Sequence, residues 1–507
     1  MSIITAAALV RVVLASLIPL FPDETYYWDW SRHLAPGYFD HPPGLAVVIS
    51  LGAGIMDRLG ARGTPLEVRT GTLVVGWLAA MATIATARRL GGDAAALRGA
   101  VLISVMPLAA AGLVLATPDA PLLAATAITL YCVVRALECP VKSTHSLRWW
   151  TAAGAALGLA FCSKYTSIFL PVAVLAAIAS RRDLRPRLTE AGPYVACAVA
   201  TIVFTPVLIW NARHGWVSVV FQLHHGLSAP EGSPLLAAWR HEGDFFGGQA
   251  GLASPILFVM LAIVTIRSLK RRAPTVEFVA AAIATLSFVF FVYSALRQRV
   301  EPNWPAPAYI PAIVLLATTR WTPRGQRWLH AGVALAALLS ATIYVQGVVP
   351  ILPLAPRKDP VARAFGWRDL TGATDSVARV VSDSTGRPTW LGADRYQEAS
   401  ELAFHDDARP PTFALNIAGR RNQYELWPQF ADRARVGDNL VLVLDPSDDM
   451  PGPVRSLLPH FEQARRSALV ALNRGQRLIG QRQVWILRGW RGSWPEVAAA
   501  GPRRSFY

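Results

Sequence analysis

The composition of this chain indicates an integral membrane protein. It has 507 residues, of which 53% are hydrophobic and only 16% are charged, and its formal net charge is +16. Soluble globular proteins are about a quarter charged, so this balance argues against a soluble enzyme. Basic loops beside anionic lipid account for the positive charge, and nucleic-acid binding is therefore not expected.

Apolar segments follow one another from the start of the chain. The first run, residues 2–20, is as long as a signal peptide, but it lacks a small-residue cleavage site, contains Arg11 and ends in Pro-Leu-Phe-Pro. We interpret it as an uncleaved helix. Runs of roughly bilayer-spanning length predict eleven transmembrane helices, at residues 3–20, 68–87, 99–116, 120–138, 149–162, 165–180, 190–210, 251–266, 276–296, 305–319 and 328–348.

One further apolar stretch, residues 43–56, decides the orientation of everything downstream. If it does not cross the membrane, most basic residues fall in loops on one side, at residues 88–98, 135–148, 181–187, 267–272 and 320–327. Cytoplasmic loops are enriched in Lys and Arg. We therefore expect 43–56 to be a helix lying at the outer surface, with the N-terminus inside and the C-terminus in the periplasm.

The long apolar segments end near residue 350, and the sequence becomes more polar. The Pro-rich segment VVPILPLAPRKDP leads into a polar tail in which DNLVLVLDP and RQVWILRGW predict strands. The segment VARAFGWRDLTGATDSVARVV has helical spacing. We expect a transmembrane catalytic domain at 1–350, with a first outer loop at about 21–67, and a small periplasmic α/β domain at 351–507.

Under this topology, polar side chains gather at the outer face. Each has an ordinary explanation, such as a helix start for Asp119 or a snorkelling side chain for Lys164. Their convergence on one side favours a site, because ionisable groups near a membrane are costly to keep. The candidates are Asp23, Glu24, Tyr27, Arg32, Tyr38, Asp40 and His41 in the first outer loop, Asp119 and Lys164 at the next two turns, His224, His225 and Gln249 in the fourth outer segment, and Arg297, Arg299, Glu301, Asn303 and Trp304 in the fifth.

This set of residues suits one kind of chemistry better than others. A carboxylate can deprotonate an attacking hydroxyl, while Lys and Arg can neutralise a departing phosphate. Aromatic, Asp, Asn and His side chains suit a sugar ring, and an apolar helix wall can hold a polyprenyl tail. No P-loop and no Gly-x-Gly-x-x-Gly after a strand is present. The four cysteines match no zinc or disulfide spacing.

The segment PDETYYWDWSRHLAPGYFDHPPG resembles the first outer loop of bacterial GT-C glycosyltransferases of families 39 and 83. These are the dolichyl-phosphate-mannose protein mannosyltransferase-like and aminoarabinose transferase-like proteins. The resemblance continues through TPDAPLL, SKYTSIFL, FQLHHGL, FFGGQAGLASP and EPNWPAPAY, and in the tail through ADRYQEASELAF and GRRNQYELWP. It implies a polytopic α-helical GT-C fold with juxtamembrane helices in the first outer loop.

The resemblance also implies an activity and a division of roles. The expected reaction is inverting transfer of a sugar from a polyprenyl-phosphate donor at the periplasmic face of the inner membrane. Asp23 would be the general base with Glu24 in support, and Lys164, Arg297 and Arg299 would bind the donor phosphate. We expect the remaining candidates, Asp119 among them, to bind substrate.

Acceptor, partners and alternatives complete the prediction. Lipid A, lipopolysaccharide or another envelope glycan is the expected acceptor, and a protein acceptor, as in protein O-mannosyltransferases, is the alternative. A flippase would instead place polar groups at mid-depth with internal symmetry. A membrane-anchored binding protein would leave the first-loop acids unexplained. We expect a monomer with no cofactor and no catalytic metal.

Overall fold

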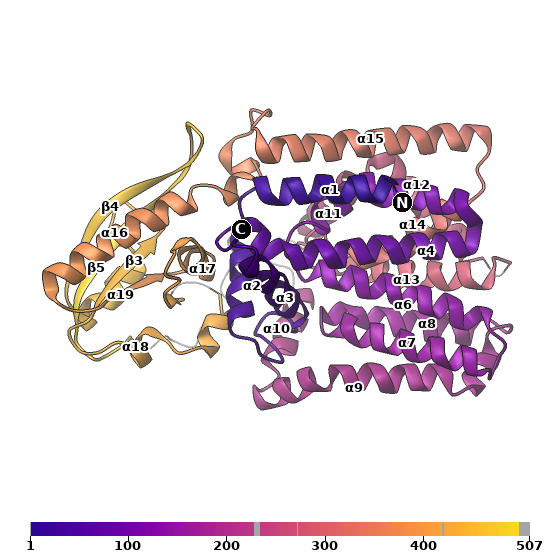
Figure 1. Cartoon of the computed structure of the whole chain (residues 1–507), viewed down its shortest axis with the longest axis horizontal. Coiled ribbons are helices and arrows are strands. Elements are labelled where there is room, and N and C mark those ends of the chain that lie inside the picture. Colours follow the sequence, from indigo (N-terminus) through magenta and orange to yellow (C-terminus); the bar gives the residue numbers. More distant parts are fainter. Residues whose placement is uncertain (1, 228–233, 271, 418–419, 496–507) are drawn as a thin grey trace. The chain divides into compact units, whose positions relative to one another are not determined.

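The computed structural model describes residues 2–227, 234–270, 272–417 and 420–495 (Figure 1). The chain divides into two compact units. The first contains residues 1–17, 34–60 and 66–349, and the second contains residues 18–33, 61–65 and 350–507. A short N-terminal segment therefore groups with the tail, although more than 300 residues of the first unit separate the two in sequence.

The first unit is built of helices, because its sequence consists of long apolar runs ended by prolines, glycines and basic residues. Its helices lie side by side in Figure 1. They are α1 (Ser2–Leu17), α3 (Gly44–Arg58), α4 (Pro65–Val105), α5 (Pro107–Gly112), α6 (Asp119–Glu138), α7 (Thr144–Phe161), α8 (Phe169–Ser180), α9 (Gly192–Arg213), α10 (Val217–Leu227), α11 (Pro234–Ala253), α12 (Pro255–Ser268), α13 (Thr275–Ala295), α14 (Ala306–Thr318) and α15 (Pro323–Val348), with 3₁₀ turns η1 (Tyr165–Ile168) and η2 (Arg185–Thr189).

Each expected transmembrane segment overlaps one of these helices. Within the described residues, α4, α6, α9, α13 and α15 are long and apolar enough to cross a membrane, and the number rises to seven if two bent helix pairs each count as one span. One bent pair is α11 with α12, which meet at 99°. The chain is thus a multi-pass membrane protein, and the total of eleven spans stays a prediction.

The stretch that decided the predicted orientation forms α3, which packs closely on α4. A Cβ atom added to Gly52 would collide with the backbone of Gly71, and one added to Gly71 would collide with the carbonyl of Val48. Only glycine allows the two backbones to approach this far. Whether α3 lies at the outer surface stays a prediction.

The second unit is α/β, as the tail sequence predicted. Its strands are β1 (Thr389–Ala393), β2 (Thr412–Ala414), β3 (Asn439–Leu444), β4 (Phe461–Arg474) and β5 (Arg477–Trp490). Their order in the sheet is β2-β1-β3-β5-β4. The two pairs that involve β1 are parallel, and β5 is antiparallel to both β3 and β4. All six residues of the central strand β3 are buried.

Helices cover this sheet and complete the unit. They are α2 (Pro22–Arg32), α16 (Trp367–Thr385), α17 (Tyr396–His405), α18 (Phe430–Arg433) and α19 (Gly452–Leu457), with 3₁₀ turns η3 (Pro356–Lys358), η4 (Ala362–Ala364), η5 (Gln423–Leu426) and η6 (Leu458–His460). On one face, Val441 of β3 packs with Ala378 and Val381 of α16. On the other face, Leu440 and Leu442 pack with residues of α18 and α19. Successive side chains of β3 point to opposite faces of the sheet, so this one strand contributes to the hydrophobic cores on both faces.

Candidate active site

The predicted acidic pair stands in the first turn of α2, and its two members have different surroundings. Pro22 occupies the first turn, where its missing N–H costs nothing, and a carboxylate there interacts favourably with the helix dipole. The Glu24 side chain is 1% exposed, and its Oε2 accepts a hydrogen bond from the Phe21 backbone N–H at 3.0 Å. Asp23 is exposed. Of the two, Asp23 is the carboxylate that an acceptor can reach.

The tail supplies the side chains around Asp23. The Tyr396 hydroxyl donates to Asp23 Oδ1 at 3.5 Å, and Arg420 Nη2 donates to the same hydroxyl at 2.9 Å. No sequence argument singled out Tyr396 or Arg420. A signal was nevertheless present, because the two residues belong to ADRYQEASELAF and GRRNQYELWP, the tail motifs that carried the family resemblance.

Hydrogen bonds along α2 hold the helix against the tail. The Tyr26 hydroxyl accepts from the backbone N–H of Gln423 at 2.7 Å, and Tyr424 donates to Asp29 Oδ2 at 2.7 Å. The Thr25 and Ser400 hydroxyls lie 3.0 Å apart. These partners come from α17 and from η5, both between β1 and β3. The position of α2 in this unit is thus set by residues remote in sequence.

Two other first-loop candidates contribute to the same helix. The Tyr27 ring packs edge-on against Trp30, with centroids 4.9 Å apart. Arg32 Nη1 pairs with Asp29 Oδ1 at 3.1 Å, and its guanidinium lies 4.8 Å from the centre of the Trp28 ring. Arg32 therefore has structural partners within α2.

A second buried carboxyl lies beneath the first turn of α2. Glu401 of α17 is 0% exposed, and its Oε2 is 3.2 Å from His405 Nε2. Burial raises the pKa of Glu401 to about 7; the charge of Glu24 acts in the same direction, and His405 opposes it. Sequence reasoning missed this group because an acid on an amphipathic helix is usually exposed.

In the first unit, three candidates from separate segments meet. Lys164 Nζ lies 2.8 Å from Asp119 Oδ1, and Asn303 Nδ2 donates to Asp119 Oδ2 at 2.6 Å. Asp119 and Lys164 are 3% and 7% exposed. Asp119 begins α6, Lys164 precedes η1 and Asn303 precedes α14. The structure thus brings these three predicted residues together.

Residues 38–41 of the first outer loop form a second group in this unit with Gln222. Gln222 Nε2 donates to the Asp40 carbonyl at 2.6 Å and lies 3.5 Å from His41 Nδ1. The Tyr38 hydroxyl accepts from the Ala35 N–H at 3.1 Å. Tyr38 and Asp40 are buried, so they shape the loop. Gln222, from FQLHHGL, was not among the predicted residues.

The remaining candidates have varied surroundings. His224 is exposed on α10, and the side chain of His225 falls outside the described part of the structure. Gln249 donates to the Pro302 carbonyl at 2.9 Å and accepts from Tyr309 at 2.8 Å. Gln249 thus anchors the segment that leads to Asn303.

Around that segment, the basic candidates point to other partners. Arg297 Nη1 donates to the Tyr293 hydroxyl at 3.2 Å, and Arg299 lies 3.5 Å from Glu301, with both side chains partly solvent-accessible. The ring of Trp304 packs near Phe291, with centroids 6.1 Å apart. Among the described residues, no group of three His, Cys, Asp or Glu side chains is placed to hold a metal ion, and metal independence stays a prediction.

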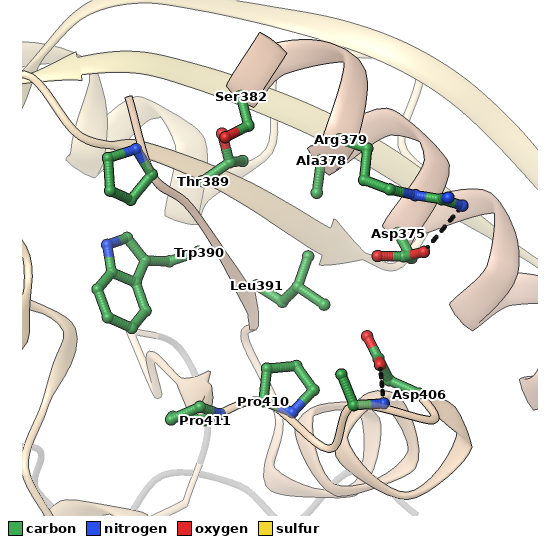
Figure 2. A pocket seen from close by; sticks show the side chains of 12 residues that line it. Asp375, Ala378, Arg379, Ser382, Thr389, Trp390, Leu391, Asp406, Pro410 and Pro411 are labelled. Atoms are coloured by element: carbon green, nitrogen blue, oxygen red, sulfur yellow. Dashed lines mark hydrogen bonds and ion pairs between the residues drawn. The ribbon is translucent and has the colours of Figure 1, made fainter. Parts of the chain in front are cut away.

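A pocket of about 360 Å³ lies within the second unit, between α16, β1 and the segment before β2 (Figure 2). Asp375 pairs there with Arg379 at 3.0 Å, and Asp406 accepts from the Ala408 N–H at 2.8 Å. None of the predicted site residues lines this pocket. It is therefore separate from the acidic pair of α2.

Comparisons with known proteins agree on one fold. Residues 40–210 match the family model for dolichyl-phosphate-mannose-protein mannosyltransferase. Over 373 residues the chain is 26% identical to lipid A galacturonosyltransferase RgtD of Rhizobium johnstonii, which covers 72% of this chain and 74% of that protein. The structure of this chain is similar to that of ArnT from Cupriavidus metallidurans in the apo state. The TM-score is 0.63, at 18% identity, and the match covers 95% of this chain and 97% of that one.

The structure of the same ArnT bound to undecaprenyl phosphate is also similar. Its TM-score is 0.60 at 17% identity, and the match covers 99% of this chain and 98% of that one. At these identities the solved structures establish the fold alone. The chain has the GT-C fold that its first-loop motif implied.

Proposed function

Because this chain is a GT-C glycosyltransferase of the ArnT and protein-mannosyltransferase type, we propose that it transfers a sugar from a polyprenyl-phosphate donor to lipid A. The observation that carries the proposed mechanism is the contrast within α2, where Asp23 is exposed and Glu24 is buried. The relative RgtD is a lipid A galacturonosyltransferase, and one structure of ArnT is bound to undecaprenyl phosphate. The lipid A acceptor and the polyprenyl-phosphate donor of this chain are proposed from these two similarities.

In the proposed step, an acceptor hydroxyl oxygen attacks the anomeric carbon of the donor sugar. A new carbon–oxygen bond forms as the bond to the phosphate oxygen breaks, and the polyprenyl phosphate leaves with that electron pair. Asp23 takes the proton of the hydroxyl, which raises the nucleophilicity of the oxygen as it attacks. A single displacement of this kind inverts the anomeric configuration.

Lys164 is the proposed partner of the donor phosphate in the first unit. Its ammonium carries three N–H donors, of which one points to Asp119. Asp119 and Asn303 then fix the direction of the ammonium, because both are hydrogen-bonded within the same buried group. A preorganised cation of this kind stabilises the charge that develops on the leaving phosphate. Arg297 and Arg299 are the further proposed phosphate partners.

The predicted topology gives the proposed location. The distribution of basic loops supports a periplasmic location for the first outer loop and the tail. An Arg62→Cys variant tests this orientation, because a thiol at that exposed position would react with a membrane-impermeant maleimide added to spheroplasts. Protection of the thiol would mean that residues 43–56 cross the membrane.

The activity test uses the purified full-length protein in nanodiscs. Undecaprenyl-phosphate carrying galacturonic acid, aminoarabinose or mannose is offered with lipid A, and the glycosylated product and its anomeric configuration are read by mass spectrometry and NMR. Asp23→Asn is compared with Asp57→Asn, which changes an exposed acid on α3. Undiminished transfer by Asp23→Asn would remove Asp23 as the base. Activity that EDTA abolishes and Mg²⁺ or Mn²⁺ restores would overturn the metal-free reaction.

A further inference from the structure

The contact between Asp23 and the tail is a chain of two hydrogen bonds with a defined direction. Tyr396 donates to Asp23 Oδ1 at 3.5 Å, and Arg420 Nη2 donates to the Tyr396 oxygen at 2.9 Å. A guanidinium has donors only and keeps its charge at any working pH, whereas a phenol has a single hydrogen. Because the Tyr396 oxygen accepts from Arg420, its one hydrogen is left to point at the Asp23 carboxylate.

Packing keeps the phenol in this place. The Tyr396 ring is 6% exposed and lies 4.3 Å from the ring of Tyr26, which is on the same helix as Asp23. The Arg420 guanidinium stands 4.9 Å from the centre of the Tyr396 ring. Ring contacts and the cation thus hold Tyr396 independently of its hydroxyl.

We propose that Tyr396, oriented by Arg420, positions the Asp23 carboxylate for proton transfer, so that the tail completes the site of the general base. This inference rests on the proposed role of Asp23. Tyr396 and Arg420 act through Asp23 and are positioning residues. The tail is then part of the catalytic machinery rather than only an appended domain.

The hydroxyl of Tyr396 has two expected effects on the reaction. It restricts the carboxylate to one rotamer, which favours the geometry of attack. It also stabilises the ionised form of Asp23, because a hydrogen bond donated to a carboxylate favours its charged state. Loss of the hydroxyl therefore lowers kcat and moves the acidic limb of the pH profile of kcat/KM to higher pH.

Tyr396→Phe is the decisive variant, since it keeps the ring and removes only the oxygen. We expect kcat to fall by roughly ten- to a hundredfold, the range that one hydrogen bond to a charged group supports, with KM for donor and lipid A unchanged. Arg420→Met should give a smaller loss, because the Tyr396 hydrogen then loses its fixed direction. Arg421→Met is the matched control: this neighbour pairs with Glu425 at 2.7 Å, and wild-type kinetics are expected.

The outcomes separate this inference from the proposed function. If Asp23→Asn is inactive but Tyr396→Phe keeps the wild-type kcat and pH profile, only the positioning role is overturned. A Tyr396→Phe protein that loses thermal stability and activity together without a shift of the pH profile would also overturn it, because a structural role explains that result. If Asp23→Asn remains active, the proposed base itself is wrong. The double variant Asp23→Asn/Tyr396→Phe should be no slower than Asp23→Asn alone.

Discussion

Asp23 and Asp119 share a Pro-Asp helix start but have different surroundings. Each follows a proline and stands in the first turn of a helix. Asp119 is buried, with Lys164 at 2.8 Å and Asn303 at 2.6 Å. Asp23 is exposed, and it accepts a hydrogen bond from the Tyr396 hydroxyl at 3.5 Å.

This difference assigns different chemistry to the two carboxylates. Asp119 is buried in an ion pair with Lys164, and removing either partner would leave an unpaired buried charge, which is costly. Asp119 is therefore suited to orient Lys164. Asp23 is exposed, so an acceptor hydroxyl can reach it. The Pro-Asp helix start places a carboxylate, and the tertiary partners decide what it can do.

The largest expected effect is on the chemistry of Asp23. Asp23→Asn should lower kcat by about 10²- to 10⁴-fold, the usual contribution of a general base, while the melting temperature stays close to the wild-type value. Steady-state transfer to lipid A and a thermal melt of the same sample measure both quantities. A melting temperature that falls along with kcat would contradict this prediction, because Asp23 would then have a structural role like that of Asp119.

The buried pair predicts the opposite pattern. Lys164→Met should destabilise the protein by about 3–5 kcal/mol, because it leaves Asp119 buried and unpaired on that side. The double variant Asp119→Leu/Lys164→Met should cost clearly less than the sum of the two single changes. Chemical denaturation in detergent measures the coupling. Additive losses would show that the two side chains do not depend on each other.

A smaller effect concerns Glu401, the buried acid beneath α2. Its pKa in the folded protein is about 7 against an ordinary value of 4.5, so the folded state binds more protons than the unfolded state between these pH values. The free energy of unfolding should therefore fall as pH rises from about 4.5 to about 7 and then level off. Glu24 of α2 and His405 of α17 face this group.

Glu401→Gln isolates that contribution. The melting temperature of this variant relative to wild type should rise between pH 5 and pH 8, by an amount equivalent to a few kcal/mol at most. Because His405 Nε2 lies 3.2 Å from Glu401 Oε2, the difference reports the Glu401 carboxyl together with its pairing to His405. A constant difference across this range would show that Glu401 is ionised throughout.

The smallest effect is expected from the neighbour of the proposed base. Glu24→Gln keeps an oxygen that can accept from the Phe21 N–H, so the helix start is preserved. We expect kcat to stay within about fivefold of wild type, equivalent to about 1 kcal/mol. Comparison with Asp23→Asn, the same amide exchange one residue earlier, sharpens the contrast. A loss as large as that of Asp23→Asn would assign Glu24 a chemical role.

Local patterns predicted the helices and the residue types of the site. Hydropathy located most helices of the first unit, but it did not predict α10 or most of α11, and the short apolar run in DNLVLVLDP predicted the buried strand β3. The first-loop motif singled out Asp23, and the outer-face argument joined Asp119, Lys164 and Asn303, which the structure brings together. These features depend on neighbours in sequence or on the membrane, both of which leave a periodic signal.

The tail contacts of α2 leave no such signal. Tyr396 and Asp23 are separated by 373 residues, and no periodicity relates positions so far apart. The same holds for Gln222, whose side chain meets the Asp40 carbonyl 182 residues away. Only the family resemblance ranked Asp23 above Glu24 at the level of the sequence. The burial of Glu24, which depends on how α2 packs, is a separate argument for the same ranking.

The packing of α2 against the tail has a consequence for biosynthesis. Trp28 and Trp30 are 1% and 0% exposed in the finished protein, yet their helix is made long before the tail that α2 packs against. At roughly 5–20 residues per second, the ribosome needs about 20–75 seconds to reach the Tyr396 codon after α2 is complete. During this interval the aromatic face lacks its final cover, so α2 is a natural substrate for chaperones or for the lipid surface until the tail arrives.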